Sequence, residues 1–320
     1  MDNNLDNDEL LVNLSEDYYL KNIPITDLTK KYNLSRYKIL KNLEQAIDNG
    51  VVTITINSPF TRNKELESFF NRQFQTTVQV LKNTENITED DGHFWDFCAK
   101  TVQSRIDQSK TVALSWGDSV YKVIEQFKNE IREDLTFTQF IGEVGKYHSL
   151  AGSLRLVQKA ASKFEANYLT LSAPLYVMND DVRELLALEP IINTTLSAAK
   201  KADLLLTGLA TPSSITSVDA WNQNKELVFG PQFNEAIGMV YGRPYDSNGQ
   251  FLNQTHDKTF GLSLVEILQI PNRIAICNNK FKANACLGAL NGNFFTDMII
   301  DEKTALKIMQ HIKRGHNLSN

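Results

Sequence analysis

The chain has few cysteines, few prolines and no long apolar run, and each scarcity excludes a class of protein. Its 320 residues include three widely spaced cysteines, so neither a disulfide framework nor a zinc site is predicted. Eight prolines and fifteen glycines are too few for a long flexible linker. No apolar run reaches about 18 residues, and the start MDNNLDNDEL is acidic. We therefore expect a cytoplasmic protein with no membrane partner, metal or cofactor.

The chain has no overall excess of positive charge, but one short stretch has a local excess. The formal net charge is −5, so the molecule as a whole does not attract nucleic acid. Residues 1–58 carry six cations and nine acids, yet no acid lies between residues 30 and 41. DNA binding would therefore depend on a local basic surface in that stretch. Its five cations are Lys30, Lys31, Arg36, Lys38 and Lys41.

The first 57 residues have the pattern of a winged helix-turn-helix. Ser35 is expected to cap the third helix, and Asn49-Gly50 to end it. The segment VVTITI (51–56) alternates with period two and is rich in β-branched residues, so it predicts a wing strand. Apolar residues at helical spacing predict the three helices within residues 10–22, 25–33 and 35–48.

The third predicted helix has the residues to enter the major groove of DNA. Its N-terminal residues would face the base edges, so we expect Arg36 and Tyr37 to contact bases beside the capping Ser35. Lys38 and Lys41 would mainly neutralise phosphates. The simpler interpretation is a basic helix face that is only solvated, the commoner fate of a charge run. The short helix spacing, the Ser-Arg-Tyr-Lys start and the strand together favour DNA binding.

After a predicted hinge at 58–64, strand-like and helix-like segments alternate through residues 65–320. This alternation predicts an α/β domain with a doubly wound, mostly parallel sheet and helices on both faces. In such a sheet a ligand binds beyond the carboxyl ends of the strands. Strands are expected in TTVQVL, TVALSW, TFTQFIG, NYLTLS, DLLLTGLA, RIAICN and FTDMIID.

One strand-to-helix turn, SWGDS, has the composition of an anion site. Gly117 lets the backbone approach an anion, and the N–H groups at Asp118 and Ser119 can receive it. An ordinary turn, with Asp118 or Ser119 as a helix cap, is equally consistent with these residues. The turn alone therefore leaves both interpretations open.

Three more polar residues are candidates for the same pocket. Arg243 could clamp a phosphate or carboxylate, or it could pair with Asp246 and hold a turn. Lys282 opens a helix after a strand, although an isolated lysine is usually only solvated. No G-x-S-x-G, H-E-x-x-H, Walker A or paired-carboxylate motif is present, which favours a binding protein over an enzyme.

Motifs along nearly the whole chain occur in the order of one known family. Residues 18–56 are similar to its helix-turn-helix, and VALSWGDSVYKV to its Gly-X-Ser-Trp-Gly-X-Thr motif. LSAPLYV, AIGMVYGRPYDSNG, GLSLVEILQIPNRIAIC and KANACLGALNGNFFTDMIIDEKTA match its later landmarks. In these motifs the chain resembles the SorC/DeoR-type regulators of bacterial sugar and nucleoside catabolism.

The resemblance implies a sugar-isomerase-like effector domain that binds a phosphorylated sugar. It also implies a homo-oligomer, a dimer or tetramer, that binds double-stranded operator DNA. Gly117 and Ser119 match the phosphate turn of the family, with serine in place of threonine. Arg243, Asp246 and Lys282 match positions near its pocket.

Two departures from the family pattern affect the expected pocket. Gly145-Lys146 stands where the family has paired glycines, so Lys146 adds a cation to the rim. A plain phosphate contact or a surface lysine is the simpler interpretation, and a Schiff base with an aldehyde sugar is the alternative. Asp118 would repel a phosphate unless its side chain points away.

Together these observations predict a DNA-binding regulator of carbohydrate or nucleoside catabolism, controlled by a phosphorylated sugar. One alternative is a sugar-phosphate isomerase-like enzyme with a DNA-binding appendage. Such an enzyme needs a positioned acid–base pair, and the sequence shows no convincing one. A second alternative is a sugar-binding protein that has lost DNA binding.

Overall fold

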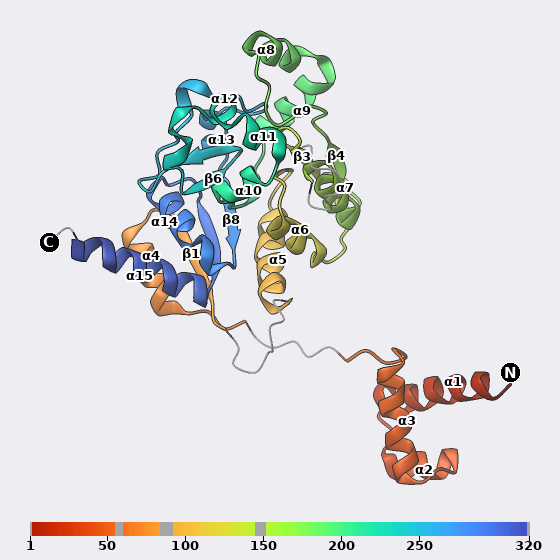
Figure 1. The fold of residues 1–320 in the computed structure, drawn as a ribbon. Helices are drawn as coiled ribbons and strands as arrows, with labels where there is room; N and C mark the ends of the chain where they lie inside the picture. The colour runs from red at the N-terminus through yellow and green to blue at the C-terminus, as the bar shows by residue number, and fades with distance from the viewer. Residues whose placement is uncertain (1, 55–59, 84–91, 145–151, 319–320) are drawn as a thin grey trace. The chain divides into compact units, whose positions relative to one another are not determined.

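The computed structural model describes residues 2–54, 60–83, 92–144 and 152–318 (Figure 1). The chain divides into two compact units, unit 1 (Met1–Pro59) and unit 2 (Phe60–Asn320). Within the described ranges, no helix is both long enough and apolar enough to cross a membrane.

The described part of unit 1 consists of helices packed on a small core. α1 (Asp2–Ser15) runs into a π-helical turn, η1 (Glu16–Leu20), and α2 (Ile25–Tyr32) and α3 (Arg36–Asp48) follow. Between α2 and α3 the chain turns at Asn33, which has a left-handed φ of 51°. The core consists of the buried side chains of Leu14, Leu28, Ile39 and Leu43.

A buried carboxylate ties η1 to α2. Asp17 accepts hydrogen bonds from Lys31 at 2.5 Å, from the Tyr32 hydroxyl at 2.6 Å and from Lys21 at 2.9 Å. These donors, Lys31 foremost, hold the pKa of Asp17 well below its usual range. Burial, together with the bond to Asp17, raises the pKa of Tyr32 to about 12. The cluster thereby fixes η1, which continues from α1, against α2, and α3 packs on α1 and α2.

The predicted wing strand is absent from the part of its span that the structure describes. Residues 51–54 form a bend and an irregular segment, and residues 55 and 56 lie outside the described ranges. The Val52 N–H donates to the Ala46 carbonyl at 3.0 Å and so closes the end of α3. A β-branched pattern alone does not make a strand, because a strand needs a hydrogen-bonded neighbour.

Most of the predicted hinge at 58–64 is bound to unit 2. Phe60 packs against Phe97, with ring centroids 5.3 Å apart. Asn63 caps α4 (Lys64–Gln73) by accepting from Leu66 N–H at 3.1 Å, and its amide donates to Glu302 at 2.6 Å. Residues 60–64 are therefore held in place, and residues 58 and 59 lie outside the description.

Unit 2 is built on a seven-stranded sheet in which every neighbouring pair of strands is parallel. The strand order is β1-β9-β8-β5-β2-β3-β4. All seven predicted strands are present, but most stop short of their predicted carboxyl ends. They are β1 (Thr77–Leu81), β2 (Thr111–Leu114), β3 (Thr136–Gln139), β4 (Asn167–Leu169), β5 (Leu204–Gly208), β8 (Asn272–Cys277) and β9 (Asp297–Asp301).

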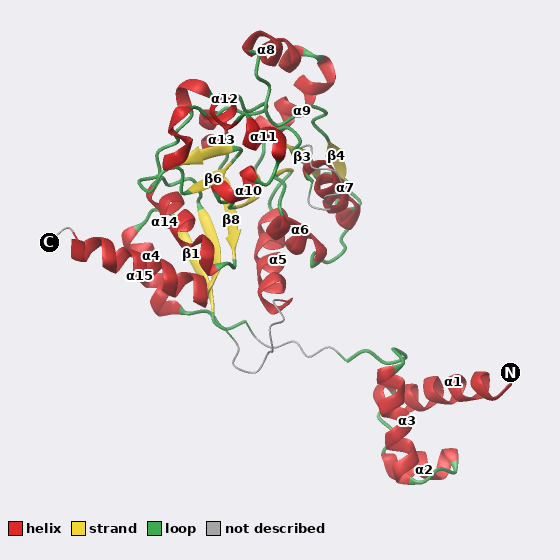
Figure 2. Cartoon of the chain, in the orientation of Figure 1, coloured by secondary structure: helices red, strands yellow, loops and turns green. Residues whose placement is uncertain are grey.

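Helices cover both faces of the sheet because side chains alternate along each strand (Figure 2). Leu204 and Leu206 pack with α5 (Gly92–Ile106), α6 (Asp118–Glu125) and α7 (Ser153–Phe164). Leu205, between them, packs in the opposite core, which confirms the doubly wound prediction. That core is covered by α4, α9 (Pro190–Lys200), α14 (Ala283–Asn291) and α15 (Glu302–Leu318).

The connection between β5 and β8 adds a small subdomain above the sheet (Figure 1). It contains an antiparallel hairpin, β6 (Gly238–Val240) and β7 (Arg243–Tyr245). α8 (Asp180–Leu188) precedes α9 earlier in the chain. The remaining short helices are α10 (Pro212–Thr216), α11 (Asp219–Gln223), α12 (Lys225–Phe229), α13 (Leu264–Gln269), η2 (Pro231–Glu235), η3 (Gln254–His256) and η4 (Lys280–Lys282).

The strand order reverses between β2 and β5. From β2 the chain proceeds outward to β3 and β4, whereas from β5 it proceeds the other way to β8 and β9. At such a reversal the loops that leave neighbouring strands diverge and open a crevice beyond their carboxyl ends. The topology therefore places the expected ligand site after β2 and β5.

Candidate functional site

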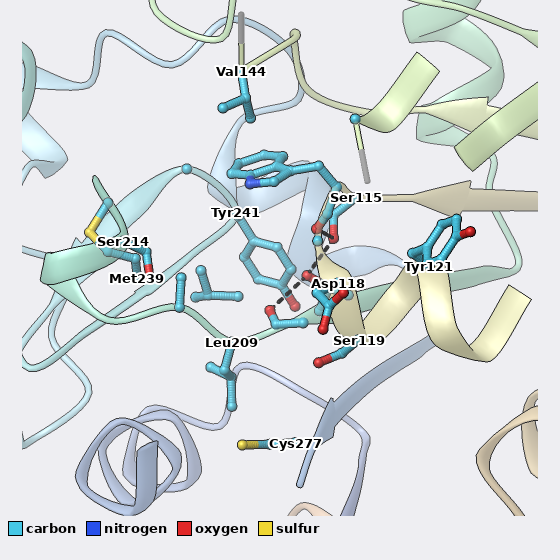
Figure 3. A pocket seen from close by; sticks show the side chains of 18 of the residues that line it. Ser115, Asp118, Ser119, Tyr121, Val144, Leu209, Ser214, Met239, Tyr241 and Cys277 are labelled. Carbon is cyan, nitrogen blue, oxygen red and sulfur yellow. Dashed lines mark hydrogen bonds between the residues drawn. The ribbon is translucent and has the colours of Figure 1, made fainter. Parts of the chain in front are cut away.

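A cavity of about 1260 Å³ lies beyond the carboxyl ends of the central strands (Figure 3). Its walls come from the residues after β2, β5 and β8, from the β6–β7 turn and from α10 and the residues that follow it. The cavity thus occupies the reversal point of the sheet, where a doubly wound fold binds its ligand.

Hydrogen bonds and close packing join the ends of β2 and β5 at the base of the cavity. The buried Ser115 hydroxyl donates to Thr207 Oγ1 at 2.9 Å, and Thr207 donates in turn to the Gly208 carbonyl at 3.1 Å. A Cβ placed on Gly208 would lie 3.8 Å from the Ser119 Cβ. The start of α6 therefore sits directly beside the end of β5.

The turn at Gly117 presents the first turn of α6 to the cavity. Gly117 has φ 133° and ψ 153°, a backbone conformation that side chains rarely adopt, although a Cβ there would meet nothing within 4 Å. Glycine is thus required for conformation and not for space. The N–H groups of the first turn, Asp118 and Ser119 among them, have no partner within the helix and can bind an anion.

Asp118 lines the cavity and is paired within α6. Its carboxylate lies 3.4 Å from the Lys122 ammonium on the next turn of the helix, and its side chain is 76% exposed. The neighbouring cation reduces the repulsion that the carboxylate would exert on an anion at this turn.

Lys282 reaches the cavity from the opposite wall. It follows β8 at the end of η4, and its ammonium donates to the Leu209 carbonyl at 2.7 Å. An ammonium has three donors, so two remain for a ligand. Lys282 thereby links the segments after β8 and β5 and places a positive charge on the cavity wall.

The β6–β7 turn closes the cavity with aromatic and backbone groups. The Tyr241 hydroxyl donates to the Phe294 carbonyl at 2.9 Å, and burial raises the pKa of Tyr241 far above its usual value. Gly242, with φ 77°, accepts a hydrogen bond from the Tyr176 hydroxyl at 2.7 Å. Tyr241 and Gly242 line the cavity together with Met239 and Trp221, which give this wall apolar surface.

Arg243 and Asp246 lie outside the cavity walls and are used elsewhere. The buried Arg243 guanidinium donates to Asp257 at 2.6 Å and to the carbonyls of Tyr241 and Leu262 at 3.0 Å. Asp246 accepts from the N–H groups of residues 248 and 250 and so holds its own turn. The expected phosphate clamp at Arg243, and its expected pairing with Asp246, are therefore both corrected by the structure.

Of the other predicted pocket residues, four line the cavity and two lie outside the described residues. Gly117, Asp118, Ser119 and Lys282 all line the same cavity. Gly145 and Lys146 lie outside the described residues.

Several wall residues were not predicted, although a signal for them exists. They lie at the carboxyl end of β5 or directly after β8, at the same edge of the sheet as SWGDS. These residues include Thr207, Gly208, Asn278 and Asn279.

In unit 1, the predicted DNA-contacting residues lie at the start of α3. Ser35 caps the helix, its hydroxyl accepting from Lys38 N–H at 3.3 Å. The side chains of Arg36, Tyr37, Lys38 and Lys41 are exposed. Two of the five cations are engaged within the unit, since Lys31 binds Asp17 and Lys30 lies 3.6 Å from Asp27. The outward charge of this stretch therefore depends on α3.

Comparison with known proteins identifies the family of the chain. Residues 58–310 match the family model described as "Putative sugar-binding domain". The chain is 22% identical over 301 residues to the transcriptional regulator LsrR of Escherichia coli (strain K12), and the match covers 92% of each. It is also 22% identical over 313 residues to the sorbitol operon regulator of Klebsiella pneumoniae, covering 94% of this chain and 98% of that protein.

Solved structures show the same fold. Full-length SorC, the sorbitol operon regulator of Klebsiella pneumoniae, has a TM-score of 0.75 at 21% identity, covering 93% of this chain and 97% of that one. A DeoR family transcriptional regulator from Listeria monocytogenes has a TM-score of 0.66 at 22% identity, covering 77% of this chain and 98% of that one. The chain therefore belongs to the sugar-binding-domain family of SorC-type regulators.

Proposed function

We propose that the chain is a DNA-binding transcriptional regulator of carbohydrate or nucleoside catabolism whose affinity for DNA is set by a phosphorylated sugar. The convergence of the α6 N-terminus and Lys282 on one cavity carries this proposal. A helix N-terminus and an ammonium together bind a phosphate well. The polar and aromatic wall beside them suits the sugar.

The DNA-binding part of the proposal rests on α2 and α3. Two helices joined by a three-residue turn, with the second one basic and exposed, have the form of a helix-turn-helix. The relatives named as transcriptional regulators align over nearly the whole chain, which includes this region. A homo-oligomer, dimer or tetramer, would then read a repeated operator.

Regulation needs no reaction in the pocket. A sugar phosphate that binds one of two conformers more tightly shifts the affinity for DNA by its differential binding, typically about 1–3 kcal/mol. Glu143, the second acid in the cavity, is used in the structure, because its carboxylate accepts from the Leu154 N–H and from Gln139. This favours a structural role over that of a catalytic base.

Binding of sugar phosphates to the full chain tests the pocket. Titration calorimetry would compare glucose 6-phosphate, fructose 6-phosphate and ribose 5-phosphate with the same sugars unphosphorylated and with inorganic phosphate. Lys282→Met should weaken binding of the tightest-binding sugar phosphate by about 10- to 100-fold, since a hydrogen bond to a charged group contributes about 1.5–3 kcal/mol. The exposed Lys201→Met is the matched control and should change nothing.

Three results would count against the proposal. They are binding of no phosphorylated sugar, equal binding by phosphorylated and free sugars, and full affinity in Lys282→Met. Turnover of a sugar phosphate would establish an isomerase-like enzyme instead. Failure to retard any promoter fragment at low salt would favour a sugar-binding protein without DNA binding.

A further inference from the structure

Two of the three cysteines are partners of each other beside the cavity. Cys277 ends β8, and Cys286 lies on α14, which follows the η4 turn. Both are buried in the same core of unit 2, and the Cys286 thiol donates a hydrogen bond to Cys277. Neither forms a disulfide in this structure, so the contact joins two free thiols.

Cys277 is the member of this pair that faces the ligand site. It is one of the residues that line the cavity, and its sulfur is drawn in Figure 3. The residue is only 2% exposed, so a reagent has to be small enough to reach it through the cavity. Cys286 is fully buried and is not among the lining residues. A small reagent therefore meets Cys277 first and Cys286 only through it.

The surroundings of Cys277 favour its thiolate. The hydrogen bond from Cys286 is the largest influence that holds the pKa of Cys277 below its ordinary value. The Asn279 backbone and the Lys282 charge act in the same direction, whereas burial and Asp301 act against them. The thiolate is the form of cysteine that attacks electrophiles and oxidants. The residue at the cavity wall is therefore the more reactive thiol of the two.

We propose that Cys277 and Cys286 form an oxidation site, in which a small hydroperoxide that enters the cavity converts the two thiols to a disulfide. The Cys277 sulfur attacks the terminal peroxide oxygen, so an S–O bond forms, the O–O bond breaks, and the leaving oxygen takes a proton. The Cys286 sulfur then attacks the sulfenic acid, so an S–S bond forms and the oxygen leaves as water with the Cys286 proton. The two thiols lose two electrons, and the peroxide gains them.

The disulfide would join the two ends of a segment of the cavity wall. Asn278, Asn279 and Lys282 lie between the two cysteines, and all three line the cavity. A bond from Cys277 to Cys286 would close this segment into a loop and restrict its movement. The proposal does not rest on the proposed function, since it needs only the cavity and the two thiols, and neither sugar nor DNA enters its test.

Peptide mapping of the full-length protein tests the oxidation site. The reduced protein would be treated with excess hydrogen peroxide under native conditions, alkylated and digested. Lys280 and Lys282 separate the two cysteines, so trypsin leaves them on different peptides. We expect these peptides to be joined after treatment, with the loss of two hydrogen atoms, and to separate when a reductant is added. The wild-type chain alone gives this result, so it does not depend on the folding of any variant.

The third cysteine is the internal control. Cys98 is buried in the core on the opposite face of the sheet and is not among the cavity residues. Burial raises the pKa of its thiol well above the ordinary value. Cys98 should therefore remain a thiol in the treated protein, and Cys98→Ala should form the same disulfide as the wild type.

Two variants separate the roles of the paired cysteines. In Cys286→Ser the oxidation should stop at the sulfenic acid of Cys277, which dimedone captures. In Cys277→Ser the Cys286 thiol should survive the treatment, and circular dichroism would check that both variants fold. Three results would overturn the proposal: a Cys277 that stays a thiol in the wild type, an oxidised Cys277 that is not joined to Cys286, and oxidation of Cys286 in Cys277→Ser.

Discussion

The two units assemble their candidate sites in different ways. In unit 1 the proposed DNA contacts Arg36, Tyr37, Lys38 and Lys41 all come from one helix, α3, and lie within six residues of the chain. In unit 2 the cavity is assembled from residues 115–119, 207–210 and 277–282, which only the strand order brings together. A local pattern is therefore enough to find the first site, whereas the second requires the topology.

The units also differ in how much core supports them. The described part of unit 1 buries six apolar side chains, four of them in one cluster, whereas unit 2 has a large core on each face of its sheet. A unit with a small core has a small free energy of unfolding. Unit 1 should therefore unfold before unit 2 when both are destabilised.

Leu28→Ala should have the largest effect. Removing a buried leucine costs about 2–5 kcal/mol, which is enough to unfold a unit with so small a core. Hydrogen exchange should show the α2 and α3 amides unprotected, and DNA binding should be lost. Binding of a sugar phosphate should be unchanged. Leu40→Ala, at an exposed leucine of α3, is the control for folding, and equal protection in the two variants would contradict the proposed core.

Gly117→Val should weaken binding of the sugar phosphate by about tenfold or more. Valine is strained at φ 133°, and relief of that strain would turn the α6 N–H groups away from the anion. Titration calorimetry measures the loss. Gly50→Val repeats the change at a glycine of unit 1 with φ 73° and open space, and it should leave affinity for the sugar phosphate intact. Equal losses in both variants would show that the effect is not local.

Arg36→Ala should weaken binding to the specific operator by about 1–3 kcal/mol and affect other DNA less. Lys41→Ala should instead weaken binding to all DNA and reduce the salt slope by about one. Fluorescence anisotropy at several salt concentrations distinguishes the two. If Arg36→Ala leaves specific binding intact, α3 does not read the operator as proposed.

The smallest effect is expected from mild acid on unit 1. The pKa of Asp17 is lower in the folded than in the unfolded chain, so its contribution to stability is complete above the unfolded value of about 3.9 and declines below it. Between pH 7 and 5 the Asp17 carboxyl should therefore leave the hydrogen-exchange protection of the α2 amides unchanged. Below about pH 4 its protonation should reduce that protection. The Asp17→Asn variant should lack that fall; if it retains it, another group is responsible.

Much of the fold follows from the sequence because its signals are local. Apolar spacing placed all seven strands of the main sheet, and the side chain of Ser35 caps α3 as expected. The strands ended early, at Leu114 and Gln139 for example, because pairing stops where the chain turns into the loops around the site. The wing failed as a strand over 51–54 because a period-two pattern does not reveal whether a partner strand exists.

The candidate site in unit 2 was less predictable than the strands, because its residues are brought together by the fold and not by a local sequence pattern. Gly117 was predicted because it stands in a strand-to-helix turn where a glycine lets the backbone approach an anion, and Lys282 because it opens a helix after a strand. Arg243 was misplaced because its burial and its bond to Asp257 depend on how distant loops fold together. Asn278 and Thr207 have no local signature, and only the order of the strands places them beside SWGDS.

We propose that a sugar phosphate bound to unit 2 changes the affinity of unit 1 for DNA. The most direct test is to titrate a fragment of the chain's own promoter with the full-length protein, with and without saturating sugar phosphate. We expect the affinity for DNA to change by about 5- to 150-fold in the wild type. We expect a much smaller change at the same sugar-phosphate concentration in Lys282→Met. An affinity for DNA that is the same with and without every sugar phosphate that binds would contradict the account.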